Sequence, residues 1–242
     1  KNNPTHMQAV IPMAGKGKRM AQTYQGPKQL LQVGGQPLVE YALGALPADI
    51  DELVFIVGGP YEQQVREYFG GEHRGRKVTY VRQPEPLGLG HAIQQAGSVV
   101  HGKFLVVLPD DIYGAEDLHA MMRHDGLAML AKRVEQPENF GVLVCDAEGC
   151  LVRAVEKPKE YVSDLVSIGT YLLDREFFDI RVPPAVRGEI ELPDLVMALV
   201  RERGRRVKVM EASFWLAVNN PEQLSLADQE MLKRVKEQAS QS

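Results

Sequence analysis

Glycines and cations gather early in the chain, where an apolar run gives way to a loop. Residues 9–13 are apolar, and Ala-Gly-Lys-Gly-Lys-Arg follows at residues 14–19. Glycines let a backbone turn tightly, and the unpaired N–H groups of such a loop can contact an anion. With Arg19 and Lys28 to supply positive charge, this segment predicts a phosphate-binding loop at the end of a buried strand.

The loop alone does not identify a ligand. The dinucleotide-binding fingerprint requires a third glycine where Met20 stands, and the P-loop requires a Ser or Thr after Gly-Lys. A tight turn without a ligand is the alternative interpretation of an isolated Gly-x-Gly. The phosphate interpretation therefore depends on other polar groups that reach the same edge of the fold.

Carboxylates follow a second apolar run. Residues 105–108 read Leu-Val-Val-Leu, and Pro-Asp-Asp comes next. A carboxylate at a strand end beside a phosphate loop is a typical ligand of a hard divalent cation that bridges phosphate oxygens. We interpret Asp110 as a metal ligand and Asp111 as a turn residue, with a simple turn cap as the alternative for either.

A turn rich in proline and glycine, residues 83–90, leads into a predicted helix. The side-chain amide of Gln83 can hydrogen-bond the edge of a base, and Gly88 would let a flat base lie against the backbone. His91 is interpreted as a residue at the helix start with no ligand of its own.

The elements that must position these groups alternate between apolar strands and amphipathic helices. Strands are predicted at residues 9–13, 53–57, 78–81 and 104–108, and helices at 37–46, 61–69 and 90–100. Strands that are apolar on both faces and separated by helices indicate a parallel sheet covered by helices. Ligands of such sheets bind at the carboxyl ends of the strands.

The second half of the chain has a different pattern. Strand-like segments are predicted at residues 127–133, 141–145, 151–156 and 166–173, and helices at 116–124, 191–203 and 222–238. We expect a mixed extension of the sheet and a closing helix whose apolar side carries Leu224, Ala227, Met231 and Val235. Because no repeat or linker interrupts the chain, we expect one domain at residues 8–242, with residues 1–7 either foreign or disordered.

Composition excludes several classes of protein. The chain has 242 residues, of which 44% are hydrophobic, and a net charge of -4. Neither this charge nor any basic run favours binding to nucleic acid or to an anionic membrane, and no apolar stretch reaches the ~18–20 residues of a membrane span. Cys145 and Cys150 are too few for a disulfide framework, and we expect reduced thiols in a soluble, cytoplasmic protein.

Taken together, the motifs resemble those of the sugar-1-phosphate nucleotidyltransferases, also called nucleoside-diphosphate-sugar pyrophosphorylases. The resemblance runs from residue 8 to about residue 226 and is carried, in order, by AVIPMAGKGKRM, PKQLLQVGGQPLVEY, RQPEPLGLGHAI, VVLPDD, FGV, VEKP, GEIEL and WLAVNNPEQL. It implies a Rossmann-like three-layer α/β fold with a mostly parallel central sheet and a mixed sugar-binding extension. It also implies a reaction in which an NTP and a sugar 1-phosphate give a nucleoside-diphosphate sugar and pyrophosphate with Mg²⁺.

The same resemblance implies a role for each matching residue. The nucleotide would lie on Ala14, Gly15 and Gly17, and its base on Gln83 and Gly88. The sugar would face Gly141 and Glu156. The catalytic groups would be Arg19 on the β and γ phosphates, Lys28 on the α phosphate, Asp110 on the metal and Lys157 on the sugar phosphate. Cations are needed because the reaction joins two anions, whereas the attacking phosphate oxygen is already ionised and needs no general base.

Three departures from the family pattern bear on the site. Lys18 replaces the usual Thr of Gly-x-Gly-Thr-Arg, and residues 20–24 lack the usual Leu-x-Pro-x-Thr. Ala217 stands where many relatives have a metal-binding Asp, and a methyl group cannot coordinate Mg²⁺. The following Val-Asn-Asn resembles the N-acetylglucosamine-1-phosphate uridylyltransferase branch, in which an Asn binds the metal. We therefore expect Asn219, ahead of Asn220, to be the second metal ligand.

Substrate choice follows from smaller likenesses. Residues 88–92 are closer to the uridylyl branches than to the thymidylyl ones, so UTP is expected ahead of dTTP, with glucose 1-phosphate as the first sugar. Ala217 keeps open a catalytically weakened protein that only binds sugar nucleotides. An alcohol-phosphate cytidylyltransferase shares the glycine loop but would not be expected to have the Glu-Lys-Pro motif, and an NAD-dependent oxidoreductase shares the loop alone. The resemblance also suggests a homo-oligomer.

Overall fold

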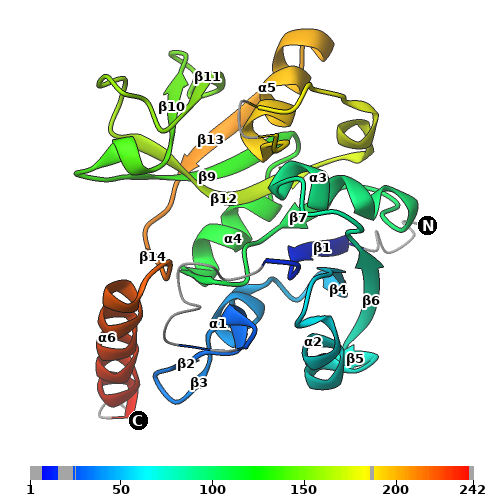
Figure 1. Ribbon diagram of the computed structural model, residues 1–242. Helices are drawn as coiled ribbons and strands as arrows, with labels where there is room; N and C mark the ends of the chain where they lie inside the picture. Colours follow the sequence, from blue (N-terminus) through cyan, green and yellow to red (C-terminus); the bar gives the residue numbers. More distant parts are fainter. Residues whose placement is uncertain (1–6, 16–23, 25, 186–187, 240–242) are drawn as a thin grey trace.

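The centre of the protein is a parallel sheet. The structure, a computed structural model, describes residues 7–15, 24, 26–185 and 188–239. Its four central strands are β7 (Phe104–Val106), β1 (Met7–Pro12), β4 (Ile50–Val57) and β6 (Arg76–Arg82), which pair in that order and all run parallel (Figure 1). All four strands predicted in the first half of the chain are therefore confirmed, and β1 begins at Met7, one residue before the expected start of the domain.

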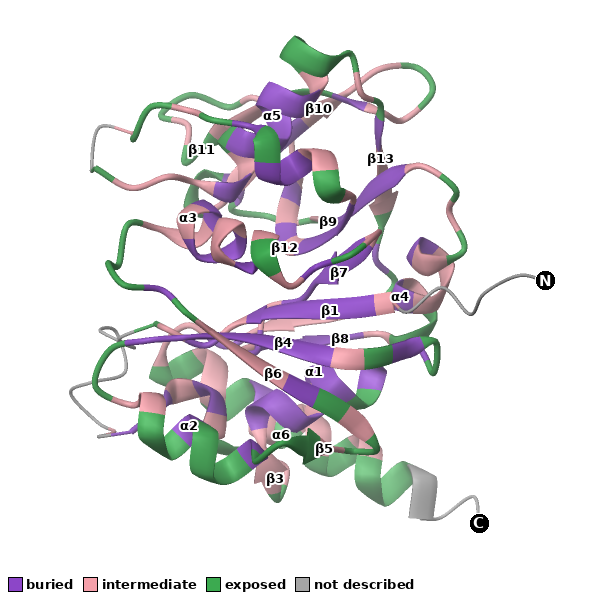
Figure 2. Cartoon of the chain, turned by 90° about the vertical axis from the view of Figure 1, so that its right-hand side faces the viewer, coloured by how far each residue is buried: buried purple, intermediate pink, exposed green. Residues whose placement is uncertain are grey.

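These strands are apolar along their whole length because both of their faces are covered. In β1, Ala9 and Ile11 belong to the core on one face of the sheet, whereas Val10 belongs to the core on the other. All three side chains are fully or almost fully buried. Successive side chains of a strand point to opposite faces, so a strand between two layers needs an unbroken apolar run. Figure 2 shows this buried centre.

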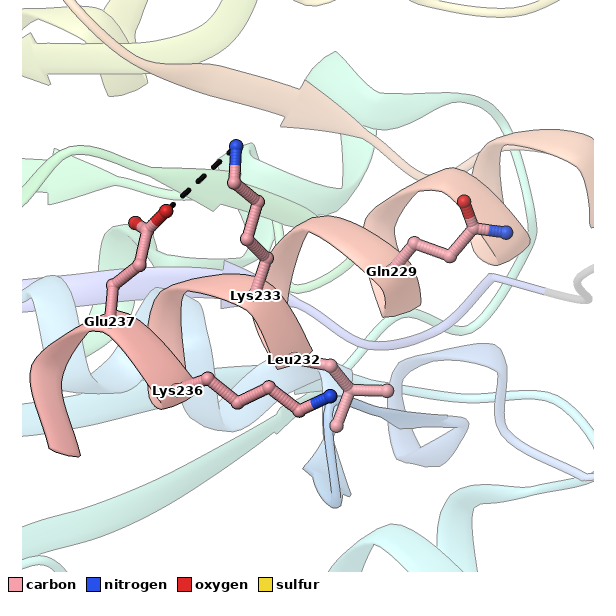
Figure 3. A pocket seen from close by; sticks show the side chains of 5 residues that line it. All are labelled: Gln229, Leu232, Lys233, Lys236 and Glu237. Carbon is pink, nitrogen blue, oxygen red and sulfur yellow. Dashed lines mark ion pairs between the residues drawn. The ribbon is translucent and has the colours of Figure 1, made fainter. Parts of the chain in front are cut away.

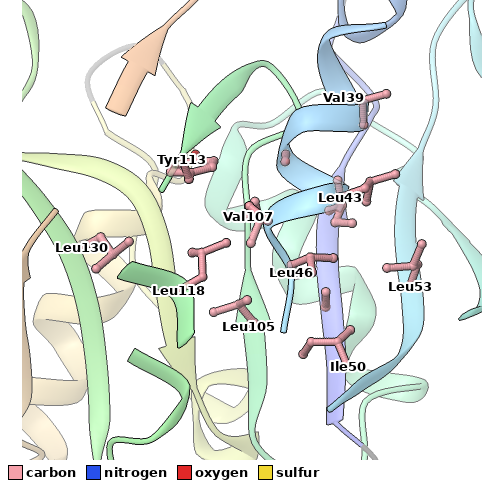
Figure 4. Packing of buried hydrophobic residues seen from close by; sticks show 14 of the residues in the cluster. Val39, Leu43, Leu46, Ile50, Leu53, Leu105, Val107, Tyr113, Leu118 and Leu130 are labelled. Atoms are coloured by element: carbon pink, nitrogen blue, oxygen red, sulfur yellow. The ribbon is translucent and has the colours of Figure 1, made fainter. Parts of the chain in front are cut away.

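Helices form the two outer layers. The first face is covered by α1 (Leu38–Ala45), α2 (Glu62–Phe69) and α4 (Ala115–Met122), and the second by α3 (Leu89–Gln94) and α5 (Leu192–Arg203). On the first face, Val39 and Leu43 of α1 pack in the same cluster as Leu105 and Leu118 (Figure 4). The helix predicted at residues 90–100 is shorter than expected, because a 3-10 turn (Gln95–Ser98) follows α3.

The second half of the chain extends the sheet with mixed strand directions. The long strand β12 (Leu165–Leu173) pairs antiparallel with β7 and joins the centre to β9 (Leu127–Arg133) and β10 (Gly141–Cys145). The outer strands of this extension are β11 (Leu151–Glu156), antiparallel to β10, and β13 (Val207–Glu211), parallel to β9. The expected combination of a mostly parallel centre and a mixed extension is confirmed.

Several short strands were not predicted. The two-residue strand β5 (Glu72–His73) adds to the outer edge of β6. A small ribbon joins β2 (Gln32–Val33) to β3 (Gln36–Pro37), and another joins β8 (Asp111–Tyr113) to β14 (Trp215–Ala217). Strands of two or three residues carry too little alternation to be recognised from sequence.

The last helix, α6 (Pro221–Ala239), lies at the periphery of the molecule, beside β14 and the β2–β3 ribbon (Figure 1). Its Ala227 packs with Val33 and Val218 in a small separate core. Val235, which was expected on the apolar side, is 52% exposed, so only the first part of the helix is packed as predicted. Among the described residues, no helix is both long and apolar enough to span a membrane.

Candidate active site

The loops after three parallel strands meet at one edge of the sheet. The Met13 N–H donates to the Ile56 carbonyl at 2.7 Å, and the Gln83 N–H donates to the Val57 carbonyl at 2.8 Å. A methyl group built on Gly58 would lie 2.8 Å from the Gln83 carbonyl oxygen and 3.5 Å from the Ala14 Cβ. Ala14 and Gln83, both predicted to contact the nucleotide, therefore lie on either side of Gly58.

The predicted phosphate loop lies only partly within the described residues. Gly15 is described and exposed, but Gly17 and Arg19 lie outside the described residues. Their predicted contacts with the nucleotide phosphates remain predictions.

The predicted base-binding loop has a specific backbone conformation. Gly88 has φ +102°, in the region that favours glycine, and a Cβ there would lie 2.7 Å from the Ile190 carbonyl oxygen. Backbone hydrogen bonds join the two segments: Gly90 N–H donates to Ile190 at 2.9 Å, and Ile190 N–H donates to Leu87 at 2.7 Å. The segment around Ile190 thus holds the loop that carries Gly88.

Lys28 is the centre of a small charged cluster. Its ammonium donates to Asp110 Oδ2 at 2.6 Å and to Asn219 Oδ1 at 3.3 Å. The side chains of Lys28 and Asp110 are 12% and 28% exposed. Lys28 begins a 3-10 turn, Asp110 follows β7, and Asn219 follows β14. Lys28 therefore contacts residues from two distant parts of the sequence, and all three were singled out from their motifs.

Asp110 is positioned by an irregularity in β12. The pairing of β12 with β9 shifts register between Ser167 and Tyr171, and Gly169 within this stretch has φ +76°. A Cβ on Gly169 would overlap the side chain of Leu108. The glycine therefore lets the segment that leads to Asp110 lie close against β12.

Asp111 has a different role from the one predicted. It is not a turn residue but the first residue of β8, and it is 4% exposed. The Trp215 indole donates to Asp111 Oδ2 at 3.0 Å, and the β8–β14 register sets Ala217 opposite Asp111. Burial, together with the charge of Asp110, raises the pKa of Asp111 to about 8. Asp111 thus links β8 to β14, the strand that leads to Asn219.

The two adjacent asparagines are clearly distinguished by their contacts. Asn220 Oδ1 accepts the Gln223 N–H at 2.8 Å, so this side chain caps the N-terminus of α6. Gln223 Oε1 in turn accepts the Asn219 N–H at 2.7 Å. Because a lysine ammonium only donates, the atom of Asn219 that faces Lys28 is its carbonyl oxygen. The geometry therefore makes Asn219, rather than Asn220, available to a cation.

The residues predicted to bind the sugar lie along one hairpin. Gly141 in β10 is directly opposite Glu156 in β11, and the Lys157 N–H donates to the Phe140 carbonyl at 3.0 Å. Lys157 has φ +43°, which is uncommon for a residue with a side chain. Its ammonium is 3.8 Å from Glu156 Oε1, and the two side chains are 38% and 34% exposed.

An aromatic contact links the sugar-side hairpin to the charged cluster. The rings of Phe140 and Trp215 are 5.7 Å apart and cross at 69°. Phe140 is the residue whose carbonyl accepts from Lys157, and Trp215 is the residue that donates to Asp111. The sugar-side hairpin and the charged cluster are therefore connected through the contact between Phe140 and Trp215, which sequence reasoning missed.

The chemistry of the cluster suits a divalent cation. A carboxylate oxygen of Asp110 and an amide oxygen of Asn219 already share one positive partner, the Lys28 ammonium. Oxygen donors of these two kinds suit Mg²⁺, which usually has one or two protein carboxylates and completes its shell with water and phosphate. Within the described part of the chain, no group of three or more His, Cys, Asp or Glu residues could hold a metal. The residues present therefore fit an ion that takes two ligands from the protein and most of the others from the substrate phosphates and water.

A hollow on α6 does not compete as the active site. It has a volume of about 450 Å³ and is lined by five residues of that helix alone, Gln229, Leu232, Lys233, Lys236 and Glu237 (Figure 3). The close-up shows Lys233 paired with Glu237 on the helix surface. None of the residues predicted to bind a substrate lines it.

Comparisons with known proteins agree with this geometry. The family model described as nucleotidyl transferase matches residues 8–234. The bifunctional protein GlmU of Methanococcus maripaludis is 30% identical over 234 residues, which cover 95% of this chain and 55% of that protein. The chain thus spans about half the length of this relative.

Two further relatives match over nearly their full length. The UTP–glucose-1-phosphate uridylyltransferase AglF of Haloferax volcanii is 30% identical, and the match covers 98% of this chain and 99% of that protein. A crystal structure from Bacillus anthracis, assigned as a glucose-1-phosphate thymidylyltransferase, superposes with a TM-score of 0.82 at 26% identity, covering 93% and 95% of the two chains.

Proposed function

The chain belongs to the nucleotidyl transferase family, among the sugar-1-phosphate nucleotidyltransferases, and on this premise we propose its reaction and substrates. The protein transfers a nucleotidyl group from UTP to a sugar 1-phosphate, preferably glucose 1-phosphate, with Mg²⁺. The observation that carries the proposal is the contact of Lys28 with both Asp110 and Asn219 at the edge of the sheet where Ala14 and Gln83 also lie.

The reaction needs positive charge more than it needs acids or bases. An oxygen of the sugar phosphate attacks the α phosphorus, a new P–O bond forms, and the bond to the β phosphate breaks to release pyrophosphate. Both reactants are anions, so Lys28 on the α phosphate and Lys157 on the sugar phosphate offset their repulsion and hold them in line. Arg19 would act on the β and γ phosphates.

A divalent ion would bind at the same cluster. Enzymes of this family generally use divalent metal ions. Asp110 and Asn219 would hold Mg²⁺, and the ion would supply charge neutralisation to the triphosphate. Lys28 contacts both of these oxygens, so an ion bound to them would replace its ammonium as their partner and leave that ammonium to interact with the α phosphate.

The choice of substrates rests on the loops around this cluster. AglF is named as using UTP and glucose 1-phosphate, which agrees with the preference inferred from residues 88–92. Gln83 and Gly88 would contact the base, and Gly141 and Glu156 would contact the sugar. The similarity to a protein assigned as a thymidylyltransferase makes dTTP the second candidate nucleotide.

A protein that binds sugar nucleotides without turning them over is the second candidate function. The observation in its favour is Ala217, which lies opposite Asp111 and whose side chain offers no oxygen to a metal. Asn219 would then take the place of the Asp that many relatives have at this position, and a neutral oxygen attracts the ion less strongly.

One assay separates these functions. The protein is incubated with Mg²⁺, each NTP in turn and a panel of sugar 1-phosphates, and pyrophosphate release is followed. We expect turnover with UTP and glucose 1-phosphate, and none when either is omitted. Turnover with another pair would correct the proposed substrates. An increase in melting temperature with UDP-glucose but no turnover would instead support the second candidate function, a protein that only binds sugar nucleotides.

A further inference from the structure

The Gln83 side chain has only one orientation that satisfies its neighbours. It is 8% exposed, and its Nε2 lies 3.1 Å from the Gly88 carbonyl oxygen and 3.1 Å from His91 Nδ1. A backbone carbonyl can only accept, so the nitrogen end of the amide must face Gly88. If the amide were turned over, two oxygens would face each other. The carbonyl of Gly88 thus decides which end of the amide is nitrogen.

His91 completes this arrangement. An amide nitrogen carries two hydrogens, and the geometry directs one to Gly88 and the other to His91 Nδ1. For Nδ1 to accept, the proton of a neutral imidazole must be on Nε2. The backbone of His91 is held in turn by Gln95, whose side chain donates to its carbonyl at 3.0 Å. The His91 ring that contacts the Gln83 amide is therefore carried by a backbone that has its own hydrogen bond to Gln95.

The consequence concerns the other end of Gln83. With both amide hydrogens used, Oε1 is the polar group that a ligand beside Gly88 would meet, and among the described residues it has no hydrogen-bond donor. We propose that His91 is a positioning residue that holds the Gln83 amide with its oxygen toward the base, so that the site selects bases with a ring N–H. The proposal rests on the proposed function and deepens it, because it names what distinguishes the nucleotides.

The chemistry of the bases makes the selection specific. Uracil and thymine carry a hydrogen on N3 and can donate it to Oε1. Cytosine N3 and adenine N1 have a lone pair in the corresponding place, and would face the lone pairs of the amide oxygen. A site that offers a buried acceptor rejects a ligand that lacks the matching donor, because the acceptor loses its partner. His91 thus contributes to specificity without touching the nucleotide.

Kinetics of two variants test this role. His91→Leu removes the acceptor and frees the amide to turn, whereas His91→Asn retains an acceptor, since the Asn carbonyl oxygen can take the place of Nδ1. We expect His91→Leu to raise the KM for UTP about 3–10-fold, as for the loss of a neutral hydrogen bond, with kcat unchanged. Its ratio of kcat/KM for UTP over CTP should fall by at least the same factor, and His91→Asn should restore it.

A matched control and the opposite outcomes complete the design. His101→Leu alters an exposed histidine whose backbone N–H, not its ring, donates to Gln8. This variant should leave unchanged both the KM for UTP and the ratio of kcat/KM for UTP over CTP. A His91→Leu enzyme with wild-type KM and wild-type UTP preference overturns the role of His91 and leaves the proposed function intact. Wild-type protein that turns over no NTP contradicts the proposed function instead.

A spectroscopic measurement keeps the inference testable if His91→Leu does not fold or no nucleotide is turned over. In protein labelled with ¹⁵N at histidine, the ring signals of His91 are assigned by their loss in His91→Asn. We expect the neutral ring of His91 to carry its proton on Nε2 and not on Nδ1, and the Nδ1 signal to change in Gln83→Leu. A proton on Nδ1 in the wild-type protein would overturn the proposal.

Discussion

The phosphate side and the sugar side of the candidate site are built in opposite ways. On the phosphate side, Asp110 and Asn219 come from distant segments and both contact Lys28, and the buried Asp111 is next to Asp110 in the sequence. On the sugar side, Glu156 and Lys157 are neighbours in sequence, exposed, and only loosely paired at 3.8 Å. One side is preorganised by the fold, and the other is open to its ligand.

This difference indicates what each side can contribute. When one partner of a partly buried ion pair is removed, the other charge stays in the protein without compensation, which is costly. An exposed pair contributes about 0–1 kcal/mol to stability and can be altered at little cost. We therefore expect variants of the phosphate side to affect the chemical step, and variants of the sugar side to affect only the binding of one substrate.

Lys28→Ala should have the largest effect. The change removes a cation from the α phosphate and leaves Asp110 without its partner at 2.6 Å. We expect kcat for pyrophosphate release to fall at least ~100-fold, as for the loss of a charge-stabilising contact of about 3 kcal/mol. Lys77→Ala is the matched control, because Lys77 is 72% exposed and its ion-pair partner among the described residues is Glu52. A near-wild-type rate in Lys28→Ala would remove Lys28 from the mechanism.

Asp110→Asn should come next, with an effect on the metal. The amide keeps an oxygen near Lys28 but loses the negative charge that attracts a divalent ion. We expect the Mg²⁺ concentration for half-maximal activity to rise about 10–100-fold, the range seen when even the outer partners of a metal are altered. Asp164→Asn, which alters an exposed partner of Arg133, should leave the Mg²⁺ dependence unchanged. An unaltered Mg²⁺ midpoint in Asp110→Asn would separate Asp110 from the metal.

The unequal construction of the two sides also explains how far the sequence could predict the fold. The central strands were recognised because strands buried on both faces need continuous apolar runs, as in β1 and β4. The short strands β8 and β14 were missed, since three residues carry no periodic signal. These two strands are what bring Asn219 next to Asp110.

For the site, residue types were easier to identify than their partners. Lys28, Asp110 and Asn219 could be selected from motifs, but Asp111 was mistaken for a turn residue because its burial depends on Trp215, which is 104 positions away. His91 was interpreted as a plain helix-start residue for the same reason, although it lies next to Gln83 in the fold. Contacts of this kind arise from tertiary packing and leave no local pattern in the sequence.

Lys157→Ala should have a smaller effect, restricted to one substrate. The Lys157 side chain is 38% exposed, so solvent already screens its interaction with a phosphate. We expect the KM for glucose 1-phosphate to rise about 10-fold, near the lower limit for a hydrogen bond to a charged group, with little change in kcat or in the KM for UTP. Lys159→Ala, two residues further on, provides a matched control. A fall in kcat as large as that of Lys28→Ala would contradict the contrast between the two sides.

Asp111→Asn should have the smallest effect on rate, and its consequence should appear in stability instead. Burial, followed by the nearby charge of Asp110, raises the pKa of Asp111 from 3.8 to about 8, so the folded protein binds one more proton than the unfolded chain between about pH 4 and pH 8. The free energy of unfolding therefore falls as pH rises through this range. Asparagine does not titrate and can still accept from Trp215, so the variant should lose this dependence.

Melting temperatures of wild type and Asp111→Asn, measured from pH 5 to pH 8, test this expectation. As the pH rises, the variant should become the more stable protein, and its melting temperature should exceed that of the wild type by about 2–4 °C for each kcal/mol of unfolding free energy that the wild type loses. The control Asp125→Asn, which alters an exposed residue, should follow the wild type. Parallel curves for wild type and Asp111→Asn would mean that Asp111 is already ionised in the folded protein, and the phosphate side would then carry one more negative charge than its contacts indicate.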